Sequence, residues 1–305
     1  MNRLAREGLN AEMRLAALIS YLMSIALLRH GTGLKRYGPA RITLAILFAV
    51  VVAAIALYFV QRLLLFPRHA TAAVVRDSDI PADVTRIWLT ADDSRVEAWL
   101  QRRVSPAPTA GQPTVLYFHG NAEIIDVLPR SLDRYRRLGF NVVLLEYPGY
   151  GRSSGWPGEQ AILSKARELL EHLQRYHGIK SDELVYHGRS LGGGVAVGLA
   201  ASNPPRALIL ESTFTSVTAL ATRMGMPDWL VRDTFDSETR LKLLDCDVLL
   251  LHGHRDEVVP VEHSEALAKA SSSSVRHVFD AGHNDLGLHA DAYWVIIAGF
   301  LAKHF

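Results

Sequence analysis

Three residues far apart in the chain carry the side chains needed to turn a hydroxyl group into a nucleophile. Ser190 is the serine of a G-x-S-x-G pattern, and Asp256 and His283 follow it along the chain. A serine hydroxyl attacks poorly until a base removes its proton, and neutral imidazole, with a pKa of about 6.5, suits this task near neutral pH. The imidazole in turn needs a carboxylate that fixes its tautomer and stabilises its cationic form. These residue types predict Ser190 as nucleophile, His283 as base and Asp256 as the acid that orients the base.

The residues on either side of Ser190 predict a strand, a sharp turn and a helix. An apolar run centred on Val185 precedes the serine, and a helix of small residues is expected from about Leu191. In so tight a bend, a β-carbon at Gly188 or Gly192 would clash with the neighbouring strand or helix. The bend lifts the hydroxyl out of the sheet and places it at a helix N-terminus, where partial positive charge favours an anionic intermediate.

The order of the remaining elements predicts an α/β fold. Residues 86–90 and 96–102 alternate apolar and polar side chains around a turn, which is typical of an antiparallel hairpin. After the hairpin, short apolar strands alternate with helices, a pattern that indicates a mostly parallel sheet with helices on both faces. We expect strands at 114–118, 141–146, 183–187, 207–210, 247–252 and 275–279, and helices at 123–138, 159–177, 191–201, 262–270 and 293–303.

Ligands of open parallel sheets bind beyond the carboxyl ends of the strands, and five predicted loops at these ends carry reactive or site-forming groups. In chain order the loops contain HGN at 119–121, EYPGYGRSSG at 146–155, GRSLGG at 188–193, HGHRDEVVP at 252–260 and AGHN at 281–284. Ser190, Asp256 and His283 belong to three of these loops. The predicted fold therefore brings the three residues to one edge of the sheet.

With these motifs, residues 86–305 resemble the α/β-hydrolase superfamily, in which nucleophile, acid and histidine follow one another in this order. Within the superfamily, the chain is most similar to membrane-anchored α/β-hydrolase-domain proteins and to serine aminopeptidase-like hydrolases. The resemblance implies an oxyanion hole made by the backbone N–H groups of Leu191 and Asn121, or of Gly120 in place of Asn121. Each donor of this kind contributes about 3–4 kcal/mol in the transition state.

Other polar residues of the same loops have supporting or alternative roles. His119 is expected to support the oxyanion loop rather than to react. Glu146 stands where the family usually has an aspartate, which leaves the hydrogen bonding of its loop open. Glu257 adjoins the predicted acid and Asp285 lies near the predicted base, so both are alternative acids.

Several residues outside the triad are candidates for contact with the substrate. Arg189 either binds a carboxylate of the substrate or contacts a neighbouring loop, and Tyr150 is a further candidate. Residues 212–244 interrupt the alternation of strands and helices and are expected to form an edge insertion or a lid over the strand ends. Three apolar side chains of this segment either line an acyl pocket or pack inside the lid: Met224, Met226 and Trp229.

An uncharged apolar run before the α/β domain predicts a transmembrane anchor at 42–62. At about 1.5 Å per residue, such a helix spans most of a hydrocarbon core of about 30 Å. The alternatives are a buried core helix and a cleaved signal peptide with an A-x-A-like site at 70–72. More basic residues lie before the run than after it, which favours a single span with the catalytic domain on the non-cytoplasmic face. A shorter apolar stretch at 13–28 is either a second span or an interfacial helix.

The remaining organisation follows from these segments. Residues 1–41 are expected to form a basic N-terminal segment, 63–83 a connector and 84–305 the α/β domain. A formal net charge of +2, without a Lys/Arg block in the globular part, disfavours nucleic-acid binding. His252 and His254 have no third ligand cluster near them in the sequence, so neither a metal nor another cofactor is expected.

Together these features predict a membrane-anchored serine hydrolase that cleaves a carboxylic ester or thioester through an acyl-enzyme. Its expected partners are a small-molecule or lipid-like acyl substrate and the membrane, and the oligomeric state is left open. A serine peptidase is the second prediction, since an aminopeptidase should bind the substrate amine with acidic side chains near the lid. Four residues leave this possibility open: Asp228, Asp233, Asp236 and Glu238. A catalytically silent binding module tethered to the membrane is the third, although such a module would require no triad.

Overall fold

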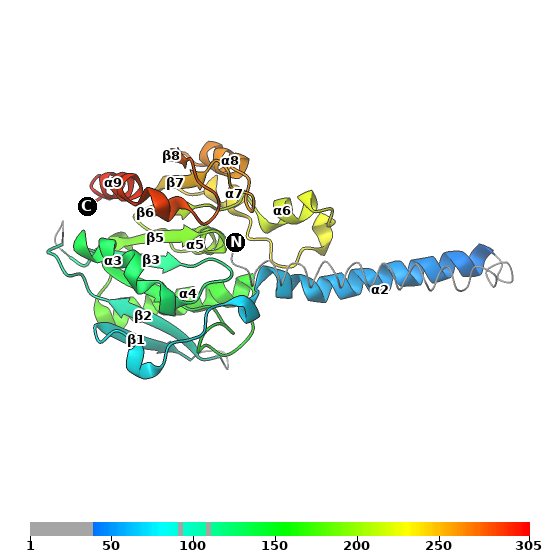
Figure 1. Cartoon of the computed structure of the whole chain (residues 1–305), viewed down its shortest axis with the longest axis horizontal. Coiled ribbons are helices and arrows are strands. Elements are labelled where there is room, and N and C mark those ends of the chain that lie inside the picture. The colour runs from blue at the N-terminus through cyan, green and yellow to red at the C-terminus, as the bar shows by residue number, and fades with distance from the viewer. Residues whose placement is uncertain (1–38, 91–93, 108–110) are drawn as a thin grey trace. The chain divides into compact units, whose positions relative to one another are not determined.

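The structure is a computed structural model, which describes residues 39–90, 94–107 and 111–305 of the 305-residue chain (Figure 1). Contacts within the chain divide it into two compact units, residues 1–70 and 71–305. The stretch 13–28, for which a second span or an interfacial helix is predicted, lies outside the described residues. The described part of the first unit consists of one long helix and a short turn after it.

Helix α2 (Pro39–Leu65) covers the whole of the predicted anchor. From Thr43, the helix and the turn that ends at Ala70 are long enough and apolar enough to cross a bilayer. The most apolar window of this stretch contains no buried side chain, which disagrees with the alternative of a core helix. By length and composition, α2 therefore fits a membrane span.

In the second unit, the described strands form one eight-stranded sheet in the order β1-β2-β4-β3-β5-β6-β7-β8. β1 (Val84–Leu89) and β2 (Val96–Gln101) make the predicted antiparallel hairpin. β2 also runs antiparallel to β4, and all further neighbours are parallel. The parallel strands are β3 (Thr114–Phe118), β4 (Asn141–Leu145), β5 (Leu184–Arg189), β6 (Ala207–Glu211), β7 (Asp247–Gly253) and β8 (Ser274–Phe279). Their carboxyl ends lie together at one edge of the sheet, here called the carboxyl edge.

Helices cover both faces of the sheet, as its continuous apolar strands require. On one face, α3 (Pro129–Arg137) and α9 (Ala290–Leu301) contribute Tyr135 and Ile297 to the same buried cluster as Val115 and Leu144 of the sheet. The other face carries α5 (Leu191–Ala200), which contacts β3, β5 and β6. Beside α5 lie α4 (Glu159–His177) and α7 (Ser237–Leu241), and α8 (Glu262–Ala270) packs on β7 and β8.

Two helices start at residues other than those predicted, whereas the ends of the predicted helices agree within two residues. The helix expected at 123–138 begins with a separate 3₁₀ turn, Ile125–Val127, and α3 starts only at Pro129. Proline has no backbone N–H and a fixed φ, so it suits the first turn of a helix and breaks its interior. The closing helix α9 starts at Ala290, after a 3₁₀ turn at Leu286–His289, rather than at 293. Neither difference changes the order of the elements.

The insertion predicted at 212–244, here called the cap segment, follows β6 at the carboxyl edge. It contains α6 (Val217–Arg223), a 3₁₀ turn at Asp228–Leu230 and α7. Helix α7 packs on α5 and α8, whereas Figure 1 shows α6 standing away from the body of the domain. The cap segment thus has a packed base and a projecting end.

Candidate active site

The turn between β5 and α5 holds Ser190 in an unusual backbone conformation. Its φ is 53° and its ψ is −117°, a combination that residues other than glycine rarely adopt. The Ser190 amide donates to the Glu211 carbonyl (2.8 Å), and the Thr213 hydroxyl donates to the Ser190 carbonyl (2.7 Å). These hydrogen bonds from the end of β6 hold the strained turn and keep the serine at the N-terminus of α5.

Two glycines allow strand and helix to approach closely at this turn. A β-carbon on Gly188 would collide with the backbone of Gly192 and Gly193 in α5. A β-carbon on Gly192 would collide with the carbonyl groups of Phe118 and His119 at the end of β3. Both collisions involve backbone atoms, which cannot swing aside as the end of a flexible side chain can. The G-x-S-x-G spacing is therefore required by packing as well as by the turn.

The three residues singled out in the sequence lie within hydrogen-bonding distance of one another. His283 Nδ1 is 2.8 Å from Asp256 Oδ2, and His283 Nε2 is 3.1 Å from Ser190 Oγ. They come from the loops after β5, β7 and β8, all at the carboxyl edge. With the Nδ1 proton assigned to the bond with the carboxylate, Nε2 is unprotonated and faces the serine hydroxyl as a hydrogen-bond acceptor.

The Asp256 carboxylate is buried, and both of its oxygens are engaged. Oδ1 accepts from the Val258 and Val259 amides (2.9 and 2.7 Å), and Oδ2 faces His283 and His252 (2.8 and 3.3 Å). Burial by itself would raise the pKa of Asp256, but the hydrogen bonds from His252, His283 and Val259 hold this pKa well below its usual range. The carboxylate is consequently ionised at neutral pH.

The alternative acids and the two neighbouring histidines occupy different surroundings. Glu257 and Asp285 are both exposed, whereas Asp256 is buried against His283. His252 is buried beside Asp256, and His254 is exposed. The geometry therefore favours Asp256 as the acid. His252 Nε2 lies 2.8 Å from the Val259 carbonyl and 3.3 Å from the Asp256 carboxylate, so His252 stands beside this acid.

The two candidate oxyanion donors in the loop after β3 differ in their partners. The Gly120 amide donates to Glu123 Oε2 (2.7 Å), so it is already engaged by a side chain that the sequence pattern does not indicate. The Asn121 carbonyl accepts from the Tyr150 hydroxyl (2.7 Å), and no acceptor for the Asn121 amide is found within the described part of the chain. The Leu191 amide opens α5 and has no acceptor within the helix. Asn121 and Leu191 are thus the available pair.

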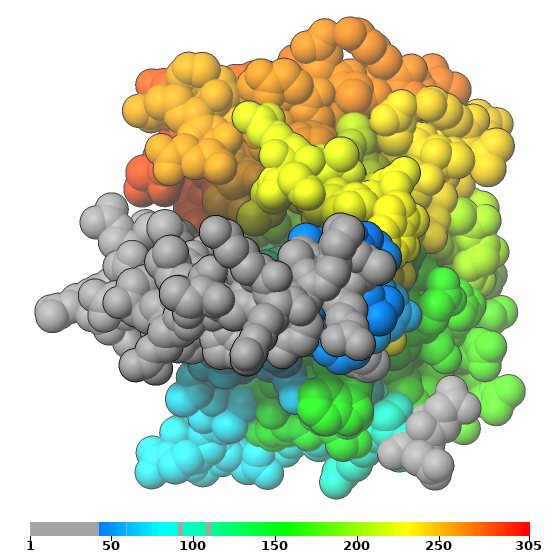
Figure 2. All heavy atoms as spheres, turned by 90° about the vertical axis from the view of Figure 1, so that its right-hand side faces the viewer, coloured from blue at the N-terminus to red at the C-terminus, as the bar shows by residue number. Residues whose placement is uncertain are grey.

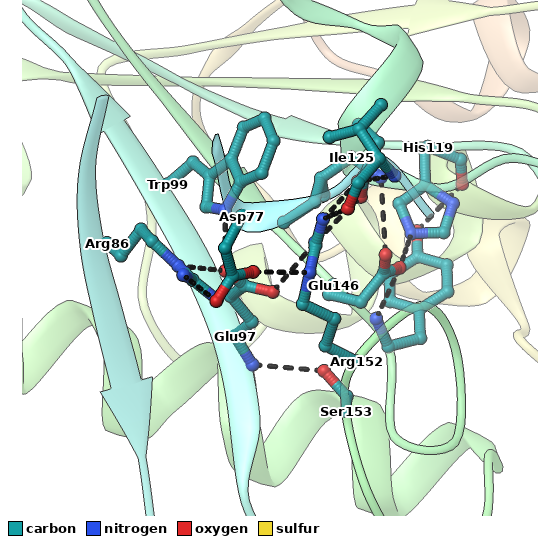
Figure 3. A network of polar contacts seen from close by, with 12 residues as sticks. Asp77, Arg86, Glu97, Trp99, His119, Ile125, Glu146, Arg152 and Ser153 are labelled. Carbon is teal, nitrogen blue, oxygen red and sulfur yellow. Dashed lines mark hydrogen bonds and ion pairs between the residues drawn. The ribbon is translucent and has the colours of Figure 1, made fainter. Parts of the chain in front are cut away.

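His119 and Glu146 form a buried pair next to this loop (Figure 3). His119 Nε2 is 2.9 Å from Glu146 Oε1, and His119 Nδ1 is 2.8 Å from the Gly120 carbonyl. The second Glu146 oxygen accepts from the Ile125 amide (3.2 Å). Burial opposes protonation of His119, but the hydrogen bond and charge of Glu146 outweigh burial and raise the pKa of His119. The sequence left open how Glu146, in the place of the family's usual aspartate, would hydrogen-bond within its loop. In the structure Glu146 binds His119 and the Ile125 amide.

A second network of buried charges lies close to this pair, with Arg152 at its centre (Figure 3). The Arg152 guanidinium donates to Asp126 (2.6 and 3.1 Å), to Glu97 (3.2 Å) and to the Val75 carbonyl (2.7 Å). Arg86 also binds Glu97 (2.7 Å). The Asp126 and Glu97 carboxylates are fully buried, so each needs this counter-charge. The partners of Arg152 are 26 to 77 residues away in the chain, and no local pattern indicates them.

Arg189, next to the nucleophile, is held by neighbouring loops. It binds Glu123 Oε1 and Asn284 Oδ1, both at 2.5 Å, and lies 3.4 Å from Glu211. Burial by itself would raise the pKa of Glu211, but His187, whose Nε2 is 3.3 Å from the carboxylate, and the charge of Arg189 lower it to about 2. The sequence left two roles open for Arg189, binding a carboxylate of the substrate or contacting a neighbouring loop. In the structure Arg189 contacts neighbouring loops.

The other candidate substrate contacts lie in two different environments. Tyr150 is buried, and its hydroxyl binds the oxyanion loop as described above. Met224 and Trp229 are 87% and 73% exposed, and Met226 is half-buried. The alternative that these side chains pack inside a lid is therefore wrong for Met224 and Trp229, because no described element covers them.

A mostly parallel sheet in this strand order, with helices on both faces and a serine at the sharp turn after β5, defines the α/β-hydrolase fold. Sequence comparison agrees: the chain is 33% identical over 257 residues to Protein bem46 of Schizosaccharomyces pombe, covering 78% of this chain and 83% of that protein. It is 32% identical over 244 residues to the alpha/beta hydrolase domain-containing protein WAV2 of Arabidopsis thaliana, covering 72% and 78%. The chain belongs to the α/β-hydrolase superfamily, as its motifs predict.

The family described as serine aminopeptidase, S33, matches residues 110–235. Among solved structures, an alpha-beta hydrolase from Vibrio vulnificus superposes with a TM-score of 0.64 at 21% identity, over 78% of this chain and 92% of that one. An esterase from Pyrococcus furiosus gives a TM-score of 0.60 at 17% identity, over 76% and 96%. At this level of identity the likeness shows the shared fold. Family and fold together confirm the predicted enzyme class, a hydrolase.

Proposed function

We propose that Ser190, His283 and Asp256 form the catalytic triad of a serine hydrolase. The observation that carries the proposal is the pair of hydrogen bonds that join Ser190 to His283 (3.1 Å) and His283 to Asp256 (2.8 Å). The strained backbone of Ser190 and the position of all three residues at the carboxyl edge support it.

In the proposed reaction, Ser190 Oγ attacks the carbonyl carbon of the substrate while His283 Nε2 takes the serine proton. The Leu191 and Asn121 amides stabilise the negative charge on the carbonyl oxygen, by about 3–4 kcal/mol for each donor. His283 then protonates the leaving group, and an acyl-enzyme remains on Ser190. A water molecule deprotonated by His283 attacks the acyl carbon, and the carboxylic acid departs as Ser190 regains its proton. Asp256 stays ionised and stabilises the imidazolium.

A carboxylic ester or thioester is the proposed substrate class. Proteins described as esterases, from Pyrococcus furiosus and Exiguobacterium antarcticum, share the fold. A peptidase of the aminopeptidase type would need acidic side chains that receive the substrate amine, and the four candidates already have partners in the fold. Asp228 accepts from the Trp229 amide, Asp233 from the Glu159 amide and Asp236 from the Thr239 amide, and Glu238 pairs with Lys242. These contacts favour an acyl ester over a peptide.

Helix α2 is proposed to anchor the enzyme as a single span, with the hydrolase domain on the non-cytoplasmic face. The length and apolar surface of α2 support the span, and the larger number of basic residues before it supports the orientation. A reporter that is active only outside the cytoplasm, fused after Phe305, is therefore expected to be active. Activity of a cytoplasm-only reporter at the same position would show that the orientation is wrong.

The triad is tested by labelling the detergent-solubilised full chain with a fluorophosphonate, which reacts with activated serines. The wild type is expected to be labelled, and Ser190→Ala and His283→Ala are expected to lose the label. Ser181→Ala, which changes an exposed serine at the opposite edge of the sheet, serves as the control. A folded wild type that takes up no label would overturn the mechanism and favour the silent binding module.

A further inference from the structure

The end of the cap segment from 216 to 231, here called the cap tip, exposes large apolar side chains. Met224 is 87% exposed and Trp229 is 73% exposed, and none of the seven residues of α6 is buried. Figure 2 shows the cap segment (yellow) at the surface of the molecule. Large apolar side chains gathered on a projecting segment are typical of a contact surface rather than of a folded core.

Hydrogen bonds and buried side chains hold the base of the cap segment against the rest of the domain. They fix the side of the domain from which the cap tip projects. The Val217 amide donates to the Thr234 carbonyl (2.8 Å), and the Ser237 amide donates to the Thr215 carbonyl (2.8 Å). Phe235, at the base, is completely buried. Because the cap segment leaves the sheet directly after β6, the cap tip projects from the carboxyl edge, which also carries the candidate nucleophile.

The connector that leads from α2 reaches the domain at this same edge. The Val75 amide donates to Asp126 Oδ1 (2.9 Å), and the Val75 carbonyl accepts from Arg152 (2.7 Å). Asp126 follows β3 and Arg152 follows β4, so both lie beyond the carboxyl ends of parallel strands. The chain is therefore fixed to the carboxyl edge at Val75.

The connector is also short. Val75 follows Leu65, the last residue of α2, by about ten residues, which reach at most about 35 Å when fully extended. A globular unit of the size of residues 71–305 has a diameter of roughly 45 Å. A tether shorter than the domain, fixed to one edge, keeps that edge close to the membrane that would hold α2.

We propose that the cap tip docks on the lipid bilayer that holds the chain's own anchor, with Met224 and Trp229 at the level of the headgroups. Tryptophan is enriched at membrane–water interfaces because its ring is apolar and its N–H is polar. Arg223, exposed at the end of α6, has the charge and geometry to bind a lipid phosphate. The docking rests on the proposed function of α2 as an anchor. It turns the edge that carries Ser190 toward the lipid, so that an acyl ester resident in the bilayer reaches the nucleophile from the membrane side.

The docking is tested on the full chain, reconstituted in vesicles of phosphatidylcholine and phosphatidylglycerol. In a Cys246→Ala background, which removes the single native cysteine, a nitroxide is attached to Met224→Cys or to Trp229→Cys. Tyr176→Cys is the matched control, since Tyr176 is 65% exposed. Tyr176 lies at the opposite edge of the sheet, because the carbonyl of the next residue, His177, binds Gln112 just before β3. Nitroxides at 224 and 229 are expected to collide with oxygen more than with a water-soluble nickel chelate, and the nitroxide at 176 is expected to show the reverse.

Nickel access at 224 and 229 equal to that at 176 would overturn the docking. Protection of 224 and 229 from both oxygen and nickel would overturn it too, because it would assign the cap tip to a protein contact with the domain or with a second copy of the chain. Release of the chain from the vesicles by alkaline carbonate would overturn the anchor and the docking together. Fluorophosphonate labelling of Ser190 in the same samples reports on the proposed hydrolase separately, since it requires no contact with lipid.

A second measurement follows the consequence for the substrate. For the double variant Met224→Ser, Trp229→Ser, the activity on a long-chain acyl ester in the bilayer is expected to fall severalfold relative to the activity on a water-soluble short-chain ester. Tyr176→Ser is expected to leave this ratio at the wild-type value. An unchanged ratio in the double variant would contradict the docking.

Discussion

The turn around Ser190 and the cap tip both lie at the carboxyl edge, yet they differ in how the chain holds them. Ser190 and Asp256 are buried, and backbone and side-chain hydrogen bonds with residues at the end of β6 keep Ser190 in a strained conformation. Met224 and Trp229 are exposed, and α6 buries no residue. A strained turn persists only where many contacts support it, whereas a segment with few contacts can adapt to what it meets. The two proposals follow this difference, since they assign chemistry to the first region and contact with the membrane to the second.

The largest effect on activity is expected from a substitution of the proposed acid, Asp256. Asp256→Asn keeps the shape of the side chain but favours the wrong tautomer of His283, and a substitution of this kind lowers the catalytic rate by about 10⁴-fold. Hydrolysis of a short-chain nitrophenyl ester measures this. Glu257→Gln, which changes the exposed neighbouring carboxylate, is expected to retain wild-type activity. Loss of activity in Glu257→Gln together with wild-type activity in Asp256→Asn would show that Glu257 is the acid.

The buried carboxylate of Glu211 is expected to make the stability of the protein depend on pH. Burial raises the pKa of Glu211, but His187, Arg189 and Tyr293 lower it from the ordinary 4.5 to about 2. A lowered pKa stabilises the folded state above pH 4.5, and this contribution is lost as the pH falls from 4.5 to about 2. Glu211→Gln is therefore expected to lower the free energy of unfolding at pH 7, on the order of 3 kcal/mol.

Urea titrations at several pH values measure this difference, which is expected to shrink in acid. Asp280→Asn, which changes an exposed carboxylate, is the control. A difference between wild type and Glu211→Gln that stays constant between neutral and strongly acidic pH would contradict the prediction.

A smaller effect is expected from loosening the oxyanion loop. Tyr150→Phe removes the hydroxyl that binds the Asn121 carbonyl and keeps the ring in place. A single hydrogen bond of this kind contributes about 0.5–1.5 kcal/mol, so kcat is expected to fall about 2- to 13-fold while KM changes little. Tyr176→Phe, which removes an exposed hydroxyl at the opposite edge, is expected to leave kcat unchanged. A change in KM alone would give Tyr150 a role in substrate binding instead.

The smallest effect on stability is expected at the cap tip. Met224→Ala, at an exposed side chain, is expected to change the free energy of unfolding in detergent by less than about 0.5 kcal/mol. Leu144→Ala, at a completely buried leucine of β4, is expected to lower it by about 2–5 kcal/mol. Denaturant titration of both variants measures the contrast directly. A large loss of stability in Met224→Ala would place Met224 in a packed core and remove the basis of the comparison.

The local sequence determined the elements and the turn that carries the candidate nucleophile. Strands β3 to β8 are predicted within two residues of their ends, since strands buried on both faces must be apolar throughout. Gly188 and Gly192 indicate the turn, because only residues without a β-carbon fit there. The alternation of strands and helices then brings Ser190, Asp256 and His283 together, because the carboxyl ends of parallel strands lie at one edge.

The tertiary structure alone decided which polar groups pair and which apolar groups stay exposed. Arg152 binds the carboxylates of Glu97 in β2 and of Asp126 in the loop after β3. Arg189 binds Glu123, so its guanidinium is already paired within the protein. Any arginine can pair with any carboxylate, so the choice depends on where the folded backbone places them and not on spacing along the chain. Met224 and Trp229 are large apolar residues of the kind usually found in a core, yet both are exposed. An apolar side chain is buried only where another element of the fold covers it.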